Sequence, residues 1–210
     1  MKQRSGPSLF GVLIYEDVEP IDIGGTLGVI SMARHVLPAV RAVVIARQTG
    51  PVRLSGGLTV LAEHAIDAAP DCDVAIVCGG PGWPAAADVA LLAYLRRLRP
   101  GRVASVCTGA LILAASGVLD GGSATTRRHA AGQEVEAPLD LLGRGGAIRP
   151  LVASVVDAGV VTGGGVSLAI DTTLYLLGRI YGTAAAAEVA RVIEYDRAYA
   201  ANRAALPLIV

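Results

Sequence analysis

The 210-residue sequence lacks an excess of charge of either sign. Its 18 basic and 18 acidic residues cancel, so the formal net charge is zero. A balanced chain has no overall field with which to recruit the phosphates of nucleic acids or an anionic membrane. We therefore expect neither a nucleic-acid partner nor a membrane partner.

Long apolar runs are also missing, although 53% of the residues are hydrophobic. A membrane-spanning helix needs about 20 consecutive apolar residues. Here Gly, Asp or Arg interrupts each run after about 5–8 positions, which is the length of a buried strand. The run Leu9–Tyr15 is followed at once by charged residues and has no small-residue cleavage site, so it predicts a first strand and not a signal peptide.

Cysteine is scarce, with only Cys72, Cys78 and Cys107 and no Cys-x-x-Cys pair. An odd number without framework spacing indicates free thiols, and we expect a cytoplasmic protein. The three histidines and three cysteines show no spacing typical of metal ligands, so we expect no metal site.

Short apolar segments alternate with longer mixed ones, which predicts an α/β fold in one domain spanning residues 1–210. The strands are almost wholly apolar, so we expect a mostly parallel sheet with helices on both faces. The expected strands are Ser8–Ile14, Ala39–Ala46, Asp73–Val77, Val103–Val106 and the pair Leu151–Val156 and Gly159–Thr162, with a hairpin or edge strand in Arg53–Leu61. The expected helices are Gly25–Ala33, Ala86–Leu98, Gly109–Ser116, Ser167–Tyr181 and Ala184–Tyr199.

Cys107 is the strongest candidate for chemistry. An apolar strand runs straight into it, and the small-residue helix Gly109–Ser116 follows, which is typical of a nucleophile elbow. A helix N-terminus favours the thiolate, so we expect an activated cysteine with a lowered pKa. A buried structural cysteine is the competing interpretation, and the elbow alone leaves the two even.

Asp22 lies between two isoleucines just after the first strand. Apolar burial or a neighbouring thiolate would raise its pKa and suit it to proton donation. Taken alone, an aspartate here is better explained as the N-cap of the first helix. A thiolate beside Asp22 would instead favour its interpretation as a proton donor.

The segment Gly79-Gly80-Pro81-Gly82-Trp83 follows a strand but lacks the residues of a phosphate loop, so it predicts no nucleotide site. We expect it to present the N–H of Gly80 to an anion developing at Cys107. Trp83 either closes the pocket or caps a helix at the surface. Cys78, directly before this segment, is expected to be structural.

A histidine base is a further option, because Thr125-Thr126-Arg127-Arg128 leads to His129. A Cys/His pair would use His129 as the base. A surface histidine explains the same position equally well, so both interpretations stay open.

Together these segments resemble the DJ-1/PfpI superfamily, whose fold is flavodoxin-like and related to class I glutamine amidotransferases. The resemblance runs from about Leu9 to Tyr195 and rests on the following segments: Val18–Gly25, Ile76–Gly82, Ala104–Gly109, Ala124–Thr126, and Val161–Gly165 with Ile170-Asp171. The Ile-Asp-Ile setting of Asp22, where DJ-1 itself has Glu, is similar to the isocyanide hydratase branch.

The resemblance implies a lyase that adds water to an isocyanide and releases an N-substituted formamide. Cys107 would be the nucleophile that forms a thioimidate, Asp22 the general acid, and Thr108 would orient the bound group with the Gly80 N–H. The substrate-binding residues would be Gly80, Gly82, Trp83 and Thr126. The family also implies a small-molecule substrate, no cofactor and a homodimer.

Two departures leave other functions open. Many relatives carry His directly after the Thr-Thr pair, where this chain has Arg127, and Pro in place of Cys78. A glyoxalase- or deglycase-like activity on reactive carbonyls is one alternative, but it would be expected with Glu at Asp22 and His after Thr126. A ligand or redox sensor, as in AraC-type regulators, is another. Those continue into a helix-turn-helix region, and the end of this chain at Val210 counts against it.

Overall fold

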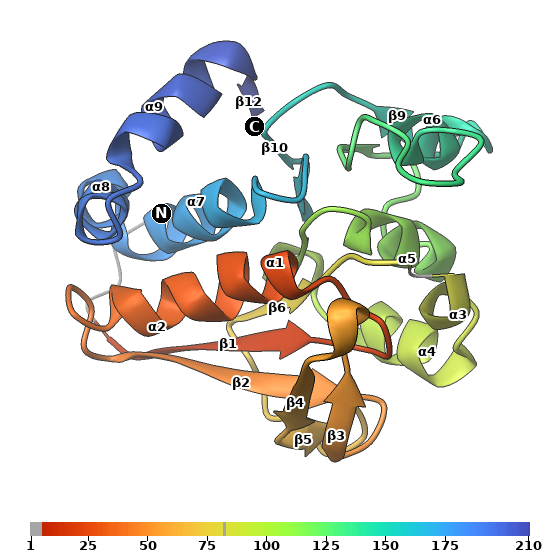
Figure 1. The fold of residues 1–210 in the computed structure, drawn as a ribbon, viewed down its shortest axis with the longest axis horizontal. Coiled ribbons are helices and arrows are strands. Elements are labelled where there is room, and N and C mark those ends of the chain that lie inside the picture. The colour runs from red at the N-terminus through yellow and green to blue at the C-terminus, as the bar shows by residue number, and fades with distance from the viewer. Residues whose placement is uncertain (1–5, 82) are drawn as a thin grey trace.

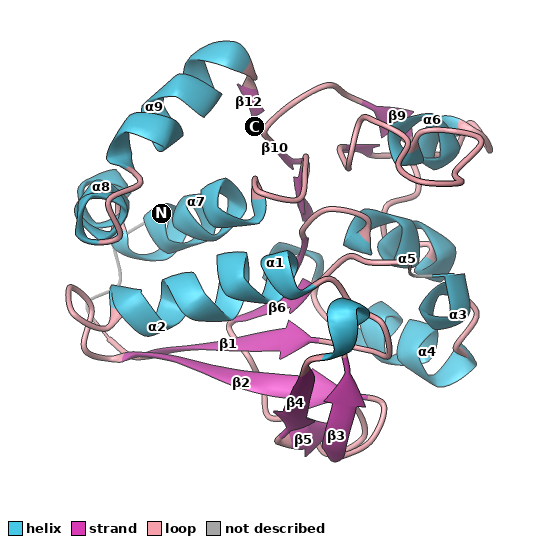
Figure 2. Cartoon of the chain, viewed as in Figure 1, coloured by secondary structure: helices cyan, strands magenta, loops and turns pink. Residues whose placement is uncertain are grey.

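An eight-stranded sheet forms the centre of the computed structural model, which describes residues 6–81 and 83–210 (Figure 1, Figure 2). Neighbouring strands are parallel except for one antiparallel pair, β10 with β11. The mostly parallel α/β sheet expected from the sequence is therefore confirmed. In order across the sheet the strands are β12 (Leu208–Ile209), β10 (Val155–Asp157), β11 (Val161–Gly163), β7 (Val103–Ser105), β6 (Val74–Val77), β1 (Ser8–Leu13), β2 (Val40–Ala46) and β5 (His64–Ala65).

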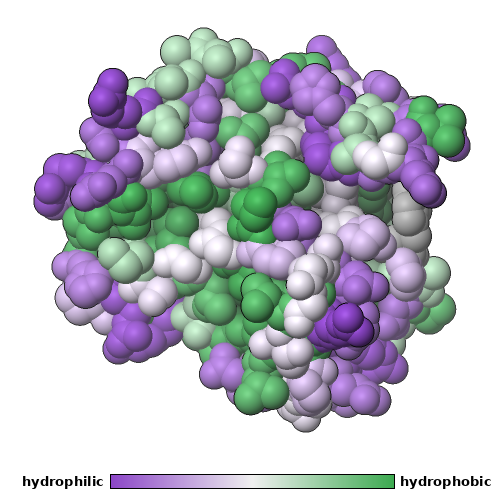
Figure 3. Space-filling view, viewed as in Figure 1, coloured by the Kyte–Doolittle hydropathy of each residue, from purple (hydrophilic) through white to green (hydrophobic). Residues whose placement is uncertain are grey.

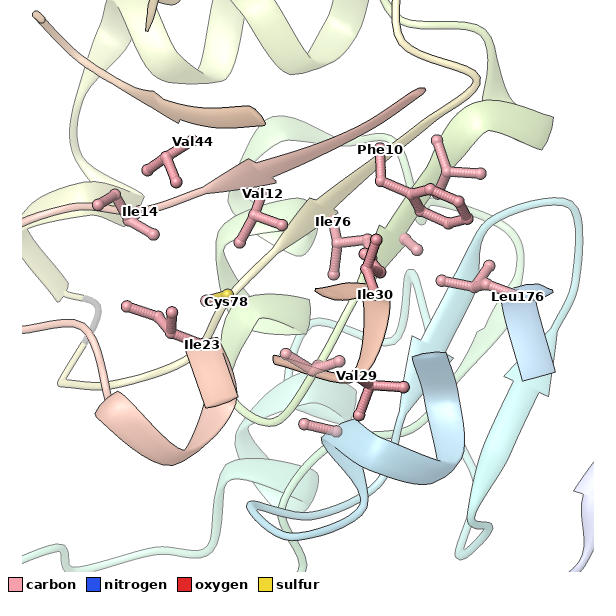
Figure 4. Close-up of a cluster of buried hydrophobic side chains, with 14 of the residues drawn as sticks. Phe10, Val12, Ile14, Ile23, Val29, Ile30, Val44, Ile76, Cys78 and Leu176 are labelled. Atoms are coloured by element: carbon pink, nitrogen blue, oxygen red, sulfur yellow. The ribbon is translucent and has the colours of Figure 1, made fainter. Parts of the chain in front are cut away.

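Helices cover both faces of this sheet, as its doubly apolar strands require. One face carries α1 (Pro20–Ile23), the π-helical turn η1 (Gly24–Gly28), α2 (Val29–Ala33), α7 (Ala169–Tyr181) and α8 (Thr183–Val192). The other face carries α4 (Val89–Arg97) and α5 (Gly109–Ser116). Figure 4 shows the first core, in which Phe10, Val12 and Ile14 of the β1 segment pack with Val29 and Ile30.

The remaining elements lie around the sheet. They are the antiparallel hairpin β3 (Gly50–Arg53) and β4 (Thr59–Ala62), the short pair β8 (Ser123–Ala124) and β9 (Arg149–Pro150), the 3-10 turns η2 (Ser55–Gly57) and η3 (Pro100–Arg102), and the helices α3 (Trp83–Ala86), α6 (Pro138–Gly143) and α9 (Asp196–Ala205). The hairpin lies where the sequence predicted one. Helix α6 was not expected.

Two expected helices differ from the structure. The first helix begins at Pro20 and not at Gly25, because Glu19 caps it and proline suits the first helical position. The single helix expected over Ala184–Tyr199 is two helices, α8 and α9. The chain turns between them at Glu194, whose φ of 55° is left-handed.

Strand register brings three loops to the same edge of the sheet. Leu13 of β1 is level with Val77 of β6, and Val77 is level with Ser105 of β7. The three parallel strands thus end side by side, and the chain reverses direction across the sheet between β1 and β6. Ligands of such sheets bind at this edge and at this switch point.

The surface carries apolar as well as charged side chains on the face shown in Figure 3, with green residues across its middle. Helices α1 and α2, at the front of Figure 1, each expose one large apolar side chain, Ile21 and Met32. Among the helices that the structure describes, none is both long and apolar enough to cross a membrane. The expected homodimer stays a prediction.

A substitution at Gly109 tests how closely the start of α5 approaches β6. A Cβ added to Gly109 would lie 2.2 Å from the Val77 carbonyl oxygen. We expect Gly109→Ala to lower the free energy of unfolding by about 2–3 kcal/mol, because the helix start must shift. Urea unfolding measures this.

Gly28 is the control for that substitution. It is exposed, helical and has no atom within 4 Å of an added Cβ. Gly28→Ala should raise the free energy of unfolding by about 0.5–1 kcal/mol. Equal unfolding midpoints for the two variants would contradict the account of this contact.

Candidate active site

Cys107 lies in a sharp turn between β7 and α5. Its φ of 49° is left-handed, which is uncommon for a residue with a side chain, and its residue exposure is only 3%. Thr126 supports the turn, because its Oγ1 donates to the Cys107 carbonyl oxygen at 2.6 Å. Strained backbone of this kind is found at functional sites. The predicted strand–turn–helix elbow is therefore present.

Asp22 is fully buried in the first turn of α1. Its Oδ2 accepts a hydrogen bond of 2.6 Å from the N–H of Gly79, in the loop after β6. Among the residues that the structure describes, Oδ1 has no hydrogen-bond partner of regular geometry. Glu19 is the N-cap, so the alternative that Asp22 caps the first helix is wrong.

Thr108 and Gly80 are hydrogen-bonded to each other, so the expected role of Gly80 needs correction. The Gly80 N–H donates to Thr108 Oγ1 at 2.8 Å, and that hydroxyl lies 2.8 Å from the Gly80 carbonyl oxygen as well. We expected this N–H to face an anion at Cys107. It is already satisfied by Thr108, so Gly80 fixes the threonine side chain instead.

Gly79 is the site residue that the sequence analysis missed. Besides donating to Asp22, it has no room for a side chain, since a Cβ would lie 2.5 Å from the Thr108 amide nitrogen and 2.7 Å from Asp22 Oδ2. The pair of glycines after β6 was a visible signal. Only the fold shows which of the two N–H groups reaches the carboxylate.

Asp22 and Cys107 lie close enough to change each other's pKa. Burial raises the pKa of Asp22 from 3.8 to about 7, with a further rise from Glu19, against the opposing N–H of Gly79. Burial also raises the pKa of Cys107 to about 12, with Asp22 adding to the rise and Thr108 opposing it. The lowered pKa expected for Cys107 is wrong, because loss of hydration outweighs the helix N-terminus.

The pair consequently loses one proton near pH 7 and keeps the second far longer. In a coupled pair these two steps belong to both groups together. Of the two groups, Asp22 has the lower pKa, so the first proton comes from its carboxyl and the Cys107 thiol stays protonated near neutral pH.

The other residues predicted for the site differ in their burial and in their hydrogen-bond partners. Thr126 is fully buried and bonded to the elbow, so it supports Cys107. Cys78 is fully buried with its sulfur 3.8 Å from Thr26 Oγ1.

His129 is exposed, and the contact it makes is through its carbonyl oxygen with Arg127, which does not favour a Cys/His pair. Gly82 lies outside the described residues, and Trp83 is placed only as the first residue of α3.

Two hollows are lined by residues next to the pair in the chain or in the loop after β6, although neither is lined by Cys107 or Asp22 themselves. A cavity of about 20 Å³, enough for one water, borders Thr108, Gly80 and Glu134. A groove of about 520 Å³ lies beyond Pro81 and is lined by Tyr15, whose buried hydroxyl has no hydrogen-bond partner within the described part of the chain. In that part, no three His, Cys, Asp or Glu side chains are grouped to hold a metal.

Comparison with known proteins agrees with this geometry. Residues 11–179 match the model of the DJ-1/PfpI family. The chain is 34% identical to a protein named isonitrile hydratase from Pseudomonas putida, over 88% of this chain and 77% of that one. It is 27% identical to the transcriptional regulator GbdR of Pseudomonas aeruginosa over 93% of this chain, which spans only 53% of the regulator.

Solved structures show the same fold. A ThiJ/PfpI family protein from Pseudomonas syringae superposes with a TM-score of 0.76 at 27% identity, covering 91% of this chain and 76% of that one. Drosophila melanogaster DJ-1beta superposes with a TM-score of 0.75 at 19% identity, covering 90% and 98%. The flavodoxin-like α/β architecture predicted from the sequence is thereby confirmed.

The raised pKa of Asp22 makes stability depend on pH. The folded state binds this proton more tightly than the unfolded chain, so the contribution is full below pH 3.8 and is lost as the pH rises through about 7. The loss amounts to about 4 kcal/mol for a shift of this size. Asp22→Asn removes the charge and can still accept from Gly79.

We expect Asp22→Asn to be more stable than the wild type at pH 8 by about 1–3 kcal/mol, with little advantage at pH 4. Urea unfolding at both pH values measures the difference, and Asp67→Asn, at an exposed position, is the control. If Asp22→Asn were less stable than the wild type at pH 8, burial of the Asp22 carboxylate would not destabilise the folded protein.

Proposed function

The chain belongs to the DJ-1/PfpI family, and we propose that its Cys107–Asp22 pair hydrates isocyanides to N-substituted formamides. One observation carries the proposal: a buried carboxyl, whose pKa is raised to about 7, lies beside a buried thiol at a nucleophile elbow. Hydration of an isocyanide needs a soft nucleophile and one proton delivered close by. The pair supplies both without a cofactor.

In the first step the sulfur of Cys107 adds to the terminal carbon of the isocyanide. Asp22 accepts the thiol proton of Cys107 as the S–C bond forms and then transfers it to that carbon. The product is a thioimidate, R–N=CH–S–Cys107, and Asp22 is left as the carboxylate. Its Oδ2 stays on the Gly79 N–H, which leaves Oδ1 as the atom that moves the proton.

In the second step water adds to the same carbon, with Asp22 accepting one proton and the nitrogen receiving one. The C–S bond then breaks, the formamide R–NH–CHO leaves, and the pair regains its single proton. The atoms balance over the two steps, because one isocyanide and one water are consumed and one formamide is formed. The cavity beside Thr108 is large enough for the attacking water.

Similarity to the Pseudomonas putida isonitrile hydratase supports this choice, since isonitrile and isocyanide name the same group. Asp22 fits the branch predicted from the sequence. We also propose a cytoplasmic homodimer acting on a small molecule, with Gly80, Trp83, Gly82 and Thr126 around the site.

The activity is tested with para-nitrophenyl isocyanide, by following formamide production. We expect turnover by the wild type, loss of at least about a thousandfold in Cys107→Ala, and a fall of about a hundredfold in Asp22→Asn, because the acid is gone. Cys72→Ala is the control. Cys72 is a buried thiol packed in the core on the other face of the sheet, and that variant should keep its activity.

The similarity to GbdR favours a sensor as the second candidate. No turnover by a correctly folded wild type, with Cys107 still reactive, would refute hydration of this substrate. Carbonyl chemistry or ligand sensing on the same fold would then be tested.

A further inference from the structure

A groove of about 540 Å³ lies where α7, α8, α9 and β12 meet, and the three helices lie together at the upper left of Figure 1. Small-molecule pockets have volumes of about 300–1,000 Å³, so the groove is large enough for a ligand. Its apolar part is formed by Leu174, Ala186, Ala187 and Leu208. None of the residues that line it belongs to the site around Cys107.

One wall of the groove carries a positive charge that is already balanced. Arg179 Nη1 lies 3.1 Å from Asp157 Oδ2, and Arg179 Nη2 donates to the Gly101 carbonyl oxygen at 3.1 Å. The Tyr175 hydroxyl donates to the same Asp157 oxygen at 2.7 Å. These contacts neutralise Arg179 and hold both side chains, so they shape this wall without adding net charge.

Arg203 of α9 supplies a second positive charge, which is not balanced. Its guanidinium lies over the ring of Tyr199, 5.4 Å from the ring centre. Among the residues that the structure describes, no carboxylate forms an ion pair with Arg203. Asp171, whose pKa Arg203 lowers, is buried and already accepts hydrogen bonds from Tyr195 and Asn202. No acidic residue lines the groove, so its lining has one positive charge in excess.

We propose that this groove binds a small aromatic monocarboxylate. The carboxylate pairs with the Arg203 guanidinium, whose planar set of N–H donors matches two carboxylate oxygens. The aromatic body lies on the apolar part of the groove and against the rings of Tyr175 and Tyr199, where ring contacts add to apolar burial. One negative charge is matched because Arg179 is neutralised and Arg203 is not. The inference goes beyond the proposed function and does not depend on it.

The test is a calorimetric titration of the full chain with 2-naphthoate, and with 2-naphthamide as an uncharged analogue of the same shape. We expect one 2-naphthoate per chain, and an affinity for 2-naphthamide about tenfold weaker because it forms no ion pair with Arg203. Arg203→Met should weaken 2-naphthoate binding by about tenfold and leave 2-naphthamide binding unchanged.

Two matched pairs of variants locate the probe. Arg197→Met is the charge control, because Arg197 is an exposed arginine of the same helix that does not line the groove, and it should bind as the wild type does. Ala187→Phe fills the groove and should abolish binding of both probes. Ala198→Phe, at an exposed alanine of α9 outside the groove, should leave both affinities unchanged. A melting temperature for each variant shows that it is folded.

Cys107→Ala separates this inference from the hydratase proposal. It should bind 2-naphthoate as tightly as the wild type, whether or not the wild type hydrates isocyanides. Loss of 2-naphthoate binding in Cys107→Ala would place the probe at the elbow and overturn the inference.

Three other results overturn it as well. The first is no binding of 2-naphthoate to the folded wild type at millimolar concentration. The second is equal affinity of Arg203→Met and Arg197→Met for 2-naphthoate. The third is an Ala187→Phe variant that binds both probes normally but changes the oligomeric state on gel filtration, because the groove would then be a contact between copies of the chain.

Discussion

A buried carboxyl beside a buried thiol is the constraint around which this end of the sheet is arranged. Burial raises the pKa of both Asp22 and Cys107, so the folded protein disfavours ionising either of them. Opposing influences are the Gly79 N–H, which donates a hydrogen bond to Asp22, and Thr108, which lowers the pKa of Cys107. Because Asp22 has the lower pKa of the two, it is the group that can accept the thiol proton when Cys107 reacts in the proposed mechanism.

The register of the sheet brings the carboxyl and the thiol together. Asp22, Gly79 and Cys107 come from loops after three different strands, and they meet because β1, β6 and β7 end level with one another. The meeting also requires very close backbone approach. Gly79 and Gly109 have neighbours that would lie within 2.5 Å of an added Cβ, so side chains at either position would separate the loops. The close approach of these loops lowers the stability of this edge of the sheet, as is common at reactive sites.

Local patterns in the sequence were enough to find the elbow and the buried aspartate. The apolar run into Cys107, the small residues after it, and the isoleucines around Asp22 are all features of neighbouring residues, and the helix bounds Gly109–Ser116 followed from the same pattern. The direction of the Cys107 pKa could not be found this way. It depends on how much water the whole fold removes, which is a property of helices and strands far away in the chain. The sequence also could not predict which N–H group, that of Gly79 or that of Gly80, reaches Asp22. The two glycines are adjacent in one short segment, and only the fold distinguishes them.

The break between α8 and α9 shows a further limit. Alanine-rich sequence lies on both sides of the break, so propensity favours helix on each side, yet the chain turns at Glu194. After that turn, Tyr195 and Asn202 both donate to Oδ2 of the buried Asp171 of α7, at 2.9 and 3.1 Å. One oxygen of a carboxylate buried in one helix is thus hydrogen-bonded by residues that the bent chain brings to it. Tertiary hydrogen bonding here overrides local preference.

Replacing histidine by arginine next to the Thr-Thr pair changes how such a site responds to pH. An imidazole beside the pair would itself titrate near the pH at which the pair loses its first proton, so the two events would be coupled. A guanidinium adds no such step, and Glu134 and His129 hold Arg127 at a fixed place. Burial is the largest influence on the pKa of Asp22 and the opposing Gly79 N–H the next, so these two set where the carboxyl titrates, with Glu19 and Arg127 as smaller influences of opposite sign.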